Sequence, residues 1–133
     1  MPADFDWAYL AGIIDGEGCI SVAITRNGAY YLQLRISQKN KGDLKKLQTK
    51  FGGRLNSNSN TQSYQLHWYG RDAEPILRNI LPYLIWKKDE AELAIAFIDQ
   101  IMISRQGRGI KQNKSLAQFI KDELQAIKRW KYA

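Results

Sequence analysis

The segment Leu10–Gly18 constrains this chain more than any other part of its sequence. It joins an apolar stretch to two carboxylates, with small residues between them. Ala8, Gly12 and Gly16 recur at every fourth position, so they fall on one face of a helix. Small residues on such a face let a second helix approach at backbone distance. The segment is too short and too acidic to span a bilayer. We therefore expect an acidic helix end packed against another helix, and a second copy of the chain would bring two Glu17 side chains together.

Length and charge limit the class of protein. The chain has 133 residues, the length of one domain, and we expect residues 1–133 to fold as a single unit. Its formal net charge is +7, with a pI near 9.6. This excess of positive charge favours a polyanionic partner, and nucleic acid before a membrane.

The cysteine content and the N-terminus indicate an intracellular protein. Cys19 is the single cysteine, so an intrachain disulfide is impossible, and its place at the start of an apolar strand favours a role in the core. There is no basic region followed by an apolar run, no visible import signal and no candidate membrane helix. We expect a microbial cytoplasm or an organelle as the location.

Hydrophobic periodicity predicts the order helix–hairpin–helix–hairpin–helices, an αββαββα pattern. This order indicates an α+β domain with one antiparallel four-stranded sheet, covered by helices on one face and open on the other. The predicted helices are Trp7–Gly16, Lys41–Phe51, Asp72–Leu81, Lys87–Ile103 and a last one opening at Ser115, and the predicted strands are Cys19–Thr25, Tyr30–Ser37, Arg54–Asn58 and Tyr64–Tyr69.

Local signals mark the ends of these elements. Asp4 or Asp6 is expected to cap the first helix, and Asn40 the second. The sequence Arg26–Gly28 contains the Asn-Gly pair of a tight hairpin. Ser115–Gln118 matches a capping box. The helix that follows it carries a predicted apolar stripe of Leu116, Phe119, Ile120, Leu124 and Ile127.

The polar face of the predicted sheet is rich in hydrogen-bond donors and has no acidic residue in either hairpin. Arginine suits guanine edges, asparagine and glutamine suit adenine, and a two-stranded ribbon fits the DNA major groove. An open face can also simply contact water, and a single exposed His67 is not expected to act as a ligand or base. The residues that we expect to contact DNA are Ser21, Ala23, Thr25, Arg26, Tyr31, Gln33, Arg35, Ser37, Arg54, Asn56, Asn58, Gln65, His67 and Tyr69.

The stretch between the last two predicted helices is a basic loop. Arg105, Arg108 and Lys111 lie within the predicted loop Ser104–Lys114. These side chains suit phosphate contacts, and they equally suit a solvated basic loop.

The first helix and the elements after it resemble a known family. Leu10–Gly18 resembles the LAGLIDADG motif of homing endonucleases, and the order of elements resembles the single-motif members over nearly the whole chain. Six of the nine motif positions agree: Leu10, Ala11, Gly12, Ile14, Asp15 and Gly18.

This resemblance implies a homodimer, with each sheet forming half of a saddle over double-stranded DNA. It places the final acidic residue of the motif, Glu17, at the scissile phosphates together with the Gly16 carbonyl, as ligands of Mg²⁺ with two or more ions per dimer. The family often has Asp at this position. The dimer interface that it implies consists of Ala8, Ala11, Gly12, Asp15 and Gly16.

Further roles follow from the same resemblance. Gln38 is expected to position water, and Lys87 to be the basic residue near the active site, with Lys88 as the alternative if the register is off by one. The implied function is that of an intron-encoded, site-specific homing endonuclease, which makes double-strand breaks in a long, pseudo-palindromic DNA target. An intron maturase or a non-cleaving nucleic-acid-binding protein of the same fold is the alternative, and a basic interaction domain unrelated to nucleic acid is a third.

The chemistry of the residues is consistent with cleavage. Divalent metals activate water and neutralise the charge that develops when a phosphodiester is attacked. Asp15 and Glu17 lie at the unfavourable end of the helix dipole without an adjacent cation in the sequence, and a bound cation would relieve this. Glu17 at a solvated helix end is the structural alternative. Asp15 is expected to form local hydrogen bonds.

Overall fold

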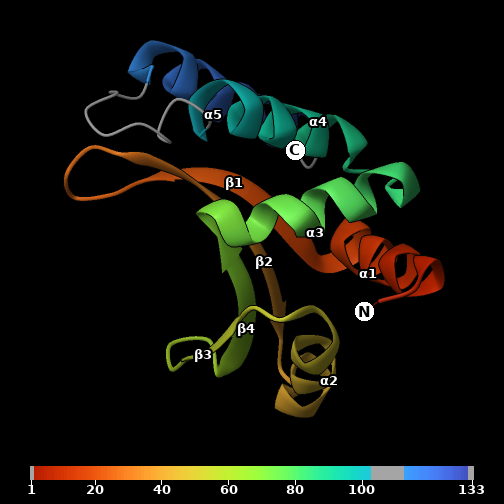
Figure 1. Ribbon diagram of the computed structural model, residues 1–133. Coiled ribbons are helices and arrows are strands. Elements are labelled where there is room, and N and C mark those ends of the chain that lie inside the picture. The colour runs from red at the N-terminus through yellow and green to blue at the C-terminus, as the bar shows by residue number, and fades with distance from the viewer. Residues whose placement is uncertain (1, 103–112, 132–133) are drawn as a thin grey trace.

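A computed structural model describes residues 2–102 and 113–131 of the chain (Figure 1). Its elements follow the predicted order. They are α1 (Asp4–Glu17), β1 (Gly18–Ile24), β2 (Tyr30–Gln38), α2 (Lys41–Phe51), β3 (Arg54–Asn58), β4 (Ser63–Tyr69), α3 (Ala73–Ile80), α4 (Lys88–Phe97) and α5 (Lys114–Lys131). Short 3₁₀ turns, Gly70–Asp72 and Leu81–Tyr83, flank α3, so this helix is shorter than the predicted Asp72–Leu81.

The four strands form one antiparallel sheet in the order β1-β2-β4-β3. Each hairpin therefore contributes an inner strand, β2 or β4, and an outer strand, β1 or β3. The helices cover one face of this sheet, as Figure 1 shows. The α+β fold with an open sheet face, expected from the periodicity, is confirmed.

The hairpin of β1 and β2 turns at the predicted place. Thr25 and Ala29 close the turn, with the Thr25 amide donating to the Ala29 carbonyl at 2.8 Å. Gly28 has a φ of 81°, a conformation that glycine adopts without a steric cost. The Asn-Gly pair therefore lies in a three-residue turn.

The core lies between the sheet and the helices. Alternate residues of β2, from Tyr30 to Ile36, are buried as predicted. They meet apolar side chains of α1, α3, α4 and α5, including Leu10, Leu77 and Phe97. Burial of apolar surface of this extent is the main stabilising term of such a domain.

Asn40 caps α2 as predicted, but α1 begins differently. The Asn40 side chain accepts hydrogen bonds from the Gly42 and Asp43 amides. Ala3, and neither Asp4 nor Asp6, is the N-cap residue of α1. The Asp6 carboxylate instead accepts from the Ala3 amide at 2.8 Å, so the helix begins before the predicted Trp7.

The C-terminal helices also depart from the prediction. α4 ends at Phe97 and continues as a π-helical turn, Ile98–Met102. α5 begins at Lys114 because the Asn113 side chain accepts from the Leu116 amide, so the predicted capping box at Ser115–Gln118 is wrong. Ala117, Ile120 and Leu124 are the buried residues of α5. Phe119, predicted to point inward, is exposed.

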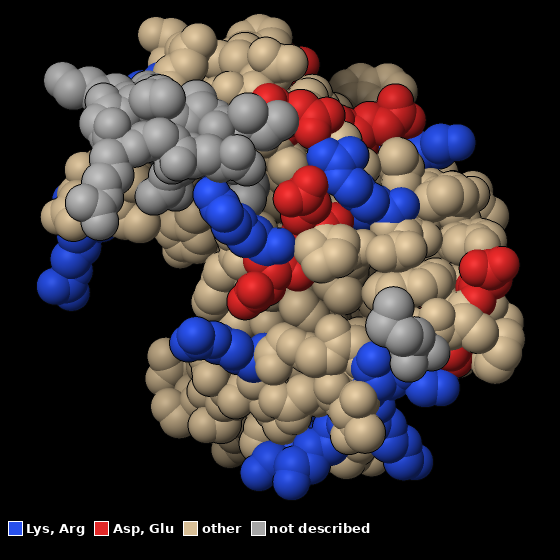
Figure 2. Space-filling model, viewed as in Figure 1, with Lys and Arg blue, Asp and Glu red and all other residues tan. Residues whose placement is uncertain are grey.

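The overall shape follows from the curvature of the sheet. Figure 2 shows the molecule hollowed on its left side, between the hairpin of β1 and β2 and that of β3 and β4. Lys and Arg side chains gather at the lower end of this view, around α2. In the described part of the chain, no helix combines the length and the apolar character that a membrane crossing requires.

Candidate functional site

The C-terminal end of α1 runs directly into the sheet. Gly18 allows this, because a Cβ at Gly18 would lie 2.8 Å from the Cα of Ile14. No other residue permits so close an approach of strand and helix without displacing one of them. As a result, Glu17 is the last residue of α1 and is exposed at the point where β1 begins.

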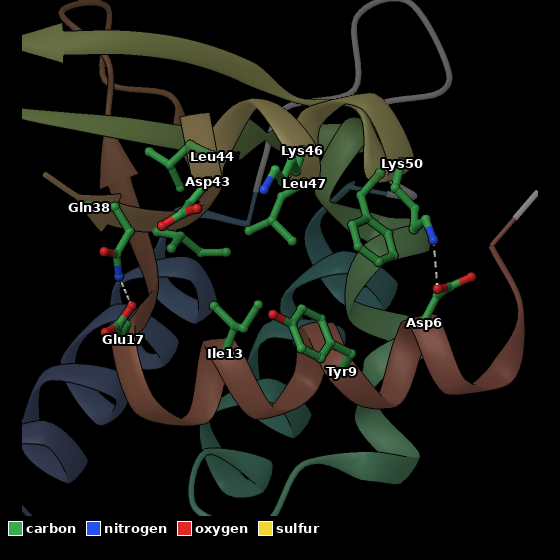
Figure 3. A pocket seen from close by; sticks show the side chains of 12 residues that line it. Asp6, Tyr9, Ile13, Glu17, Gln38, Asp43, Leu44, Lys46, Leu47 and Lys50 are labelled. Atoms are coloured by element: carbon green, nitrogen blue, oxygen red, sulfur yellow. Dashed lines mark hydrogen bonds and ion pairs between the residues drawn. The ribbon is translucent and has the colours of Figure 1, made fainter. Parts of the chain in front are cut away.

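The sheet brings Gln38 to the same point. Gly18 pairs with Ile36 across β1 and β2, so the end of β2 passes beside the end of α1. The Gln38 side-chain amide donates a hydrogen bond to a carboxylate oxygen of Glu17 (Figure 3). Two residues that the sequence predicted separately for one site are therefore in contact.

A pocket of about 490 Å³ separates α1 from α2, and Figure 3 shows its lining. The pair of Glu17 and Gln38 lies at one end. An ion pair between Asp6 and Lys50, 2.9 Å long, lies at the other. The Lys50 ammonium and then the Ala3 amide hold the pKa of the Asp6 carboxyl below its usual value. The middle of the pocket is lined by Tyr9, Ile13, Leu44 and Leu47.

The other carboxylate of the motif, Asp15, has a different environment. It is buried and accepts two backbone hydrogen bonds, from the Ile85 amide at 2.8 Å and from the Lys87 amide at 3.0 Å. These donors are 70 and 72 residues away, so the expectation of local hydrogen bonds is wrong. Asp15 fastens the segment before α4 to the end of α1.

Lys87 lies at the end of α1, whereas Lys88 is exposed as the first residue of α4. The Lys87 side chain is 6% exposed, and its Nζ donates to the Asp15 carbonyl at 2.8 Å. A cation thus occupies the favourable position at a helix C-terminus. The sequence-based view that this helix end has no adjacent cation is wrong, because the cation comes from a distant segment.

The small residues of α1 form an open surface. Gly12 and Gly16 are exposed, and a Cβ at either position would meet nothing within 4 Å. Ala8 is half-buried beside them. Two other residues expected at a dimer interface, Ala11 and Asp15, instead belong to the interior of this chain. They lie on the side of α1 that faces the sheet and the helical layer.

Two aromatic residues of this surface are not among the residues predicted for the interface. Phe5 is 74% exposed and Tyr9 is 67% exposed. Both lie on the same side of the helix as Gly12 and Gly16, at spacings of four, three and four residues. The spacing of Phe5 and Tyr9 relative to Gly12 and Gly16 is the sequence signal that predicts this shared face.

The open sheet face carries its polar residues in rows across the strands. Arg35 and Arg54 both pair with His67, so an imidazole lies between two guanidinium-bearing residues. In the neighbouring row Gln33 pairs with Tyr69. The sheet places the other predicted contact residues on this face as well: Ser21, Ala23, Tyr31, Ser37, Asn56, Asn58 and Gln65.

His67 is not the exposed histidine that the sequence suggested. It is 2% exposed, and its ring lies 4.3 Å from that of Tyr69 at an angle of 31°. Burial, followed by the charges of Arg54 and Arg35, lowers the pKa of His67. Large neighbours cover it, although its side chain points to the open face. The ring is therefore held neutral at physiological pH and supports its neighbours.

The turn residues Thr25 and Arg26 follow β1 at the tip of its hairpin. Arg105, Arg108 and Lys111 lie outside the described residues. Lys114, predicted as the end of the same loop, is the first residue of α5.

This arrangement agrees with the sequence comparison. The family model described as LAGLIDADG endonuclease matches residues 10–103, which is more than half of the chain. The chain belongs to the LAGLIDADG endonuclease family. Among curated proteins, none matches this sequence.

Solved structures of homing endonucleases share the fold. The homing endonuclease I-CvuI, in complex with the I-CreI target, is 20% identical, with a TM-score of 0.78 over 92% of this chain and 82% of that chain. The archaeal intron-encoded homing endonuclease I-Vdi141I, complexed with DNA, is 19% identical, with a TM-score of 0.61 over 92% of this chain and 98% of that chain. I-TnaI is 20% identical, with a TM-score of 0.64 over 92% of this chain and 93% of that chain.

Proposed function

We propose that this chain is a site-specific, metal-dependent DNA endonuclease that cuts both strands as a homodimer. The observation that carries the proposal is Glu17. It is an exposed carboxylate at the end of α1, oriented by Gln38, in a chain of the LAGLIDADG endonuclease family. An exposed carboxylate at the negative end of a helix dipole has little structural value, so it suits a cation ligand.

The donor set fits a hard divalent cation. Glu17 supplies carboxylate oxygen, and the Gly16 carbonyl is the neighbouring backbone donor. In residues 2–102 and 113–131, no group of three His, Cys, Asp or Glu residues forms a closed metal site. This suits Mg²⁺, which retains several waters and takes few protein ligands. When bound, the metal supplies Lewis-acid activation of water and neutralises charge on the phosphate.

The side chains around Glu17 have distinct roles. The amide of Gln38 holds the carboxylate in one orientation, and the same type of group can orient a water molecule. Lys87 has its ammonium on the Asp15 carbonyl. From this position its charge would add to the positive field at the end of α1, and that field would stabilise the negative charge of the transition state.

A second copy of the chain completes the site. Gly12 and Gly16 leave room for a helix to approach α1 at backbone distance. Phe5 and Tyr9 on the same face supply apolar surface, the usual content of a homodimer interface core. Two copies would carry a formal charge of +14, twice the +7 of one chain, and would bring two Glu17 carboxylates to one axis, one for each DNA strand.

The open sheet face serves as the DNA-reading surface. Arg35 and Arg54 present guanidinium groups suited to guanine, and Gln33, Asn56 and Gln65 present amides suited to adenine. Both hairpins lack acidic residues, so nothing in them repels phosphates. I-CvuI and I-Vdi141I are described in complex with DNA, which supports the assignment.

A library selection tests the proposal. The protein is incubated with randomised DNA duplexes and Mg²⁺, and cut ends are sequenced, in parallel with Glu17→Gln and with Mg²⁺ replaced by EDTA. We expect double-strand cuts at one long target, lost in both controls. Tight binding to duplex DNA without cuts by the native chain would instead support the non-cleaving or maturase alternative.

A further inference from the structure

Glu90, on α4, is a buried carboxyl group with no role in the proposed reaction. It is 0% exposed, and neither of its side-chain oxygens has a hydrogen-bond partner within the described part of the chain. The Lys131 ammonium lies 3.8 Å from its Oε2. An isolated buried carboxylate is costly, so its retention beside a functional site calls for an explanation.

The charges of three lysines act on this carboxyl group. Burial raises the pKa of Glu90 and outweighs the charges of Lys128, Lys131 and Lys87, which favour its ionised form. Lys87 precedes α4, and the other two belong to α5. Asp89 is the one further charged group among those that act on it, and it is itself paired with Lys131 at 2.6 Å.

Each of the three ammonium groups also donates to a backbone carbonyl of a different segment. Lys87 donates to the Asp15 carbonyl at 2.8 Å. Lys128 donates to the Ile20 carbonyl at 2.5 Å, and Lys131 to the Trp86 carbonyl at 2.5 Å. Asp15 and Ile20 flank the junction of α1 and β1 that presents Glu17. The three lysines therefore hold together the segments that surround this junction, and we call their three hydrogen bonds to carbonyls the clip.

We infer that Glu90 is a positioning residue for the cleavage centre: its buried carboxylate is the shared counter-charge that keeps Lys87, Lys128 and Lys131 on the carbonyls around Glu17. This inference rests on the proposed function. Without the negative charge of Glu90, the Asp89 carboxylate on Lys131 would offset only part of the repulsion among the three ammonium groups. The three hydrogen bonds of the clip would weaken, and the Glu17 carboxylate would become less well positioned. The sheet and the core would stay folded.

The test compares Glu90→Gln with Glu92→Gln, a matched change at an exposed glutamate of the same helix. Cleavage of the selected target and its binding with Ca²⁺ in place of Mg²⁺ are measured for both. We expect Glu90→Gln to lower the cleavage rate about 10–100-fold, as loss of an outer-shell partner does, and to leave binding unchanged. Glu92→Gln should change neither. Glu90→Asp, which keeps the charge, should recover part of the rate.

The pH profile separates positioning by charge from a packing effect. Glutamine resembles the protonated form of Glu90. The rate ratio of the native chain to Glu90→Gln should therefore fall as the pH decreases through the raised pKa, and should approach one. A ratio of one at every pH, or a constant deficit, would overturn the inference.

Amide hydrogen exchange gives a readout that does not need cleavage. Glu90→Gln should speed exchange at residues 16–20 and 85–87 and leave the centre of β2 unchanged. If Glu90→Gln does not fold, Lys128→Met replaces it, and faster exchange at residues 18–20 is the expected result. Unchanged exchange in the folded variant would overturn the inference. Failure of the native chain to cut any target, with the expected exchange pattern, would overturn the proposed function while leaving the clip itself in place.

Discussion

The two sides of the C-terminal end of α1 differ in how far their polar groups are buried and hydrogen-bonded within a single chain. On the inner side Asp15 is buried, and its carboxylate accepts from the amides of Ile85 and Lys87. On the outer side Glu17 is exposed and bonded to Gln38, and Gly12 and Gly16 have open space around them. Two carboxylates two residues apart thus have opposite environments.

This difference suits Asp15 to a structural role and Glu17 to a functional one, although both belong to the same motif. A group whose bonding capacity is filled inside the chain contributes to folding, because removing it leaves buried donors unpaired. A group left open at the end of a helix contributes little to folding and is available to a metal, DNA or a second copy. Substitutions on the inner side should therefore reduce stability, and substitutions on the outer side should reduce activity or assembly.

The largest effect should come from Glu17→Gln. We expect the cleavage rate to fall by about 10²–10³-fold or more, since an electrostatic group at the reacting phosphate is lost. Thermal unfolding should show an unchanged or slightly higher stability, because a negative charge leaves the negative end of the helix dipole. A large loss of stability would break the comparison, because it would place Glu17 with the structural carboxylates.

Asp15→Asn should give the opposite result. The neutral amide replaces a buried carboxylate that accepts two backbone hydrogen bonds, so we expect a cost of about 2–3 kcal/mol in the free energy of unfolding. Chemical denaturation measures this, with Glu92→Gln as an exposed control that should change stability by less than about 0.5 kcal/mol. An Asp15→Asn chain that is as stable as the native one would contradict the assignment.

Gly12→Leu examines the outer side without altering charge. Leucine is a better helix former than glycine by about 0.5–1 kcal/mol, and its Cβ meets no atom of the same chain. The isolated chain should keep its fold, whereas the approach of a second α1 should be blocked. Sedimentation velocity should show the native dimer converted to monomer. A variant dimer as tight as the native one would remove this face from the interface.

The smallest expected effects are changes of stability with pH. They have opposite signs for Glu90 in the interior and His67 in the sheet. Burial raises the pKa of Glu90 above its model-peptide value of 4.5, so the folded chain holds this proton more tightly than the unfolded chain. Between 4.5 and the raised value, the stability of the native chain relative to Glu90→Gln should increase as the pH falls. Thermal melts of both proteins from pH 4.5 to 8 check this.

His67 should show the reverse dependence. Burial lowers its pKa below 6.5, so the stability that it contributes is complete above this value and is lost as the pH falls through the lowered pKa. The difference in melting temperature between the native chain and His67→Gln should therefore shrink in mild acid. A difference that is independent of pH would show that the ring titrates as it does in an unfolded chain.

Local patterns in the sequence were sufficient for much of the fold. Strict alternation predicted the buried face of β2, and Asn40 predicted the start of α2, because both depend on neighbours within a few residues. The wrong predictions lie at helix N-termini where two neighbouring residues can each act as the N-cap. Asn113, not Ser115, caps α5, and Ala3 precedes α1 where an aspartate was expected.

The site was predicted in part. The sequence predicted roles for Glu17, Gln38 and Lys87, and the structure brings Glu17 and Gln38 into contact. The sequence could not show that Lys87 is buried on the Asp15 carbonyl, or that Glu90 lies 3.8 Å from Lys131 of α5. Such contacts join residues that are up to about seventy positions apart or lie on different helices, and no local pattern encodes them.

By itself the sequence determined which segments become helices and strands, which face of each is apolar, and which family the chain resembles. The tertiary structure alone decided which of the two motif carboxylates is buried and which remains exposed. The physical reason is that the state of a charged group depends on the donors and the solvent that surround it in the fold. At the end of α1 those donors come from the segment before α4.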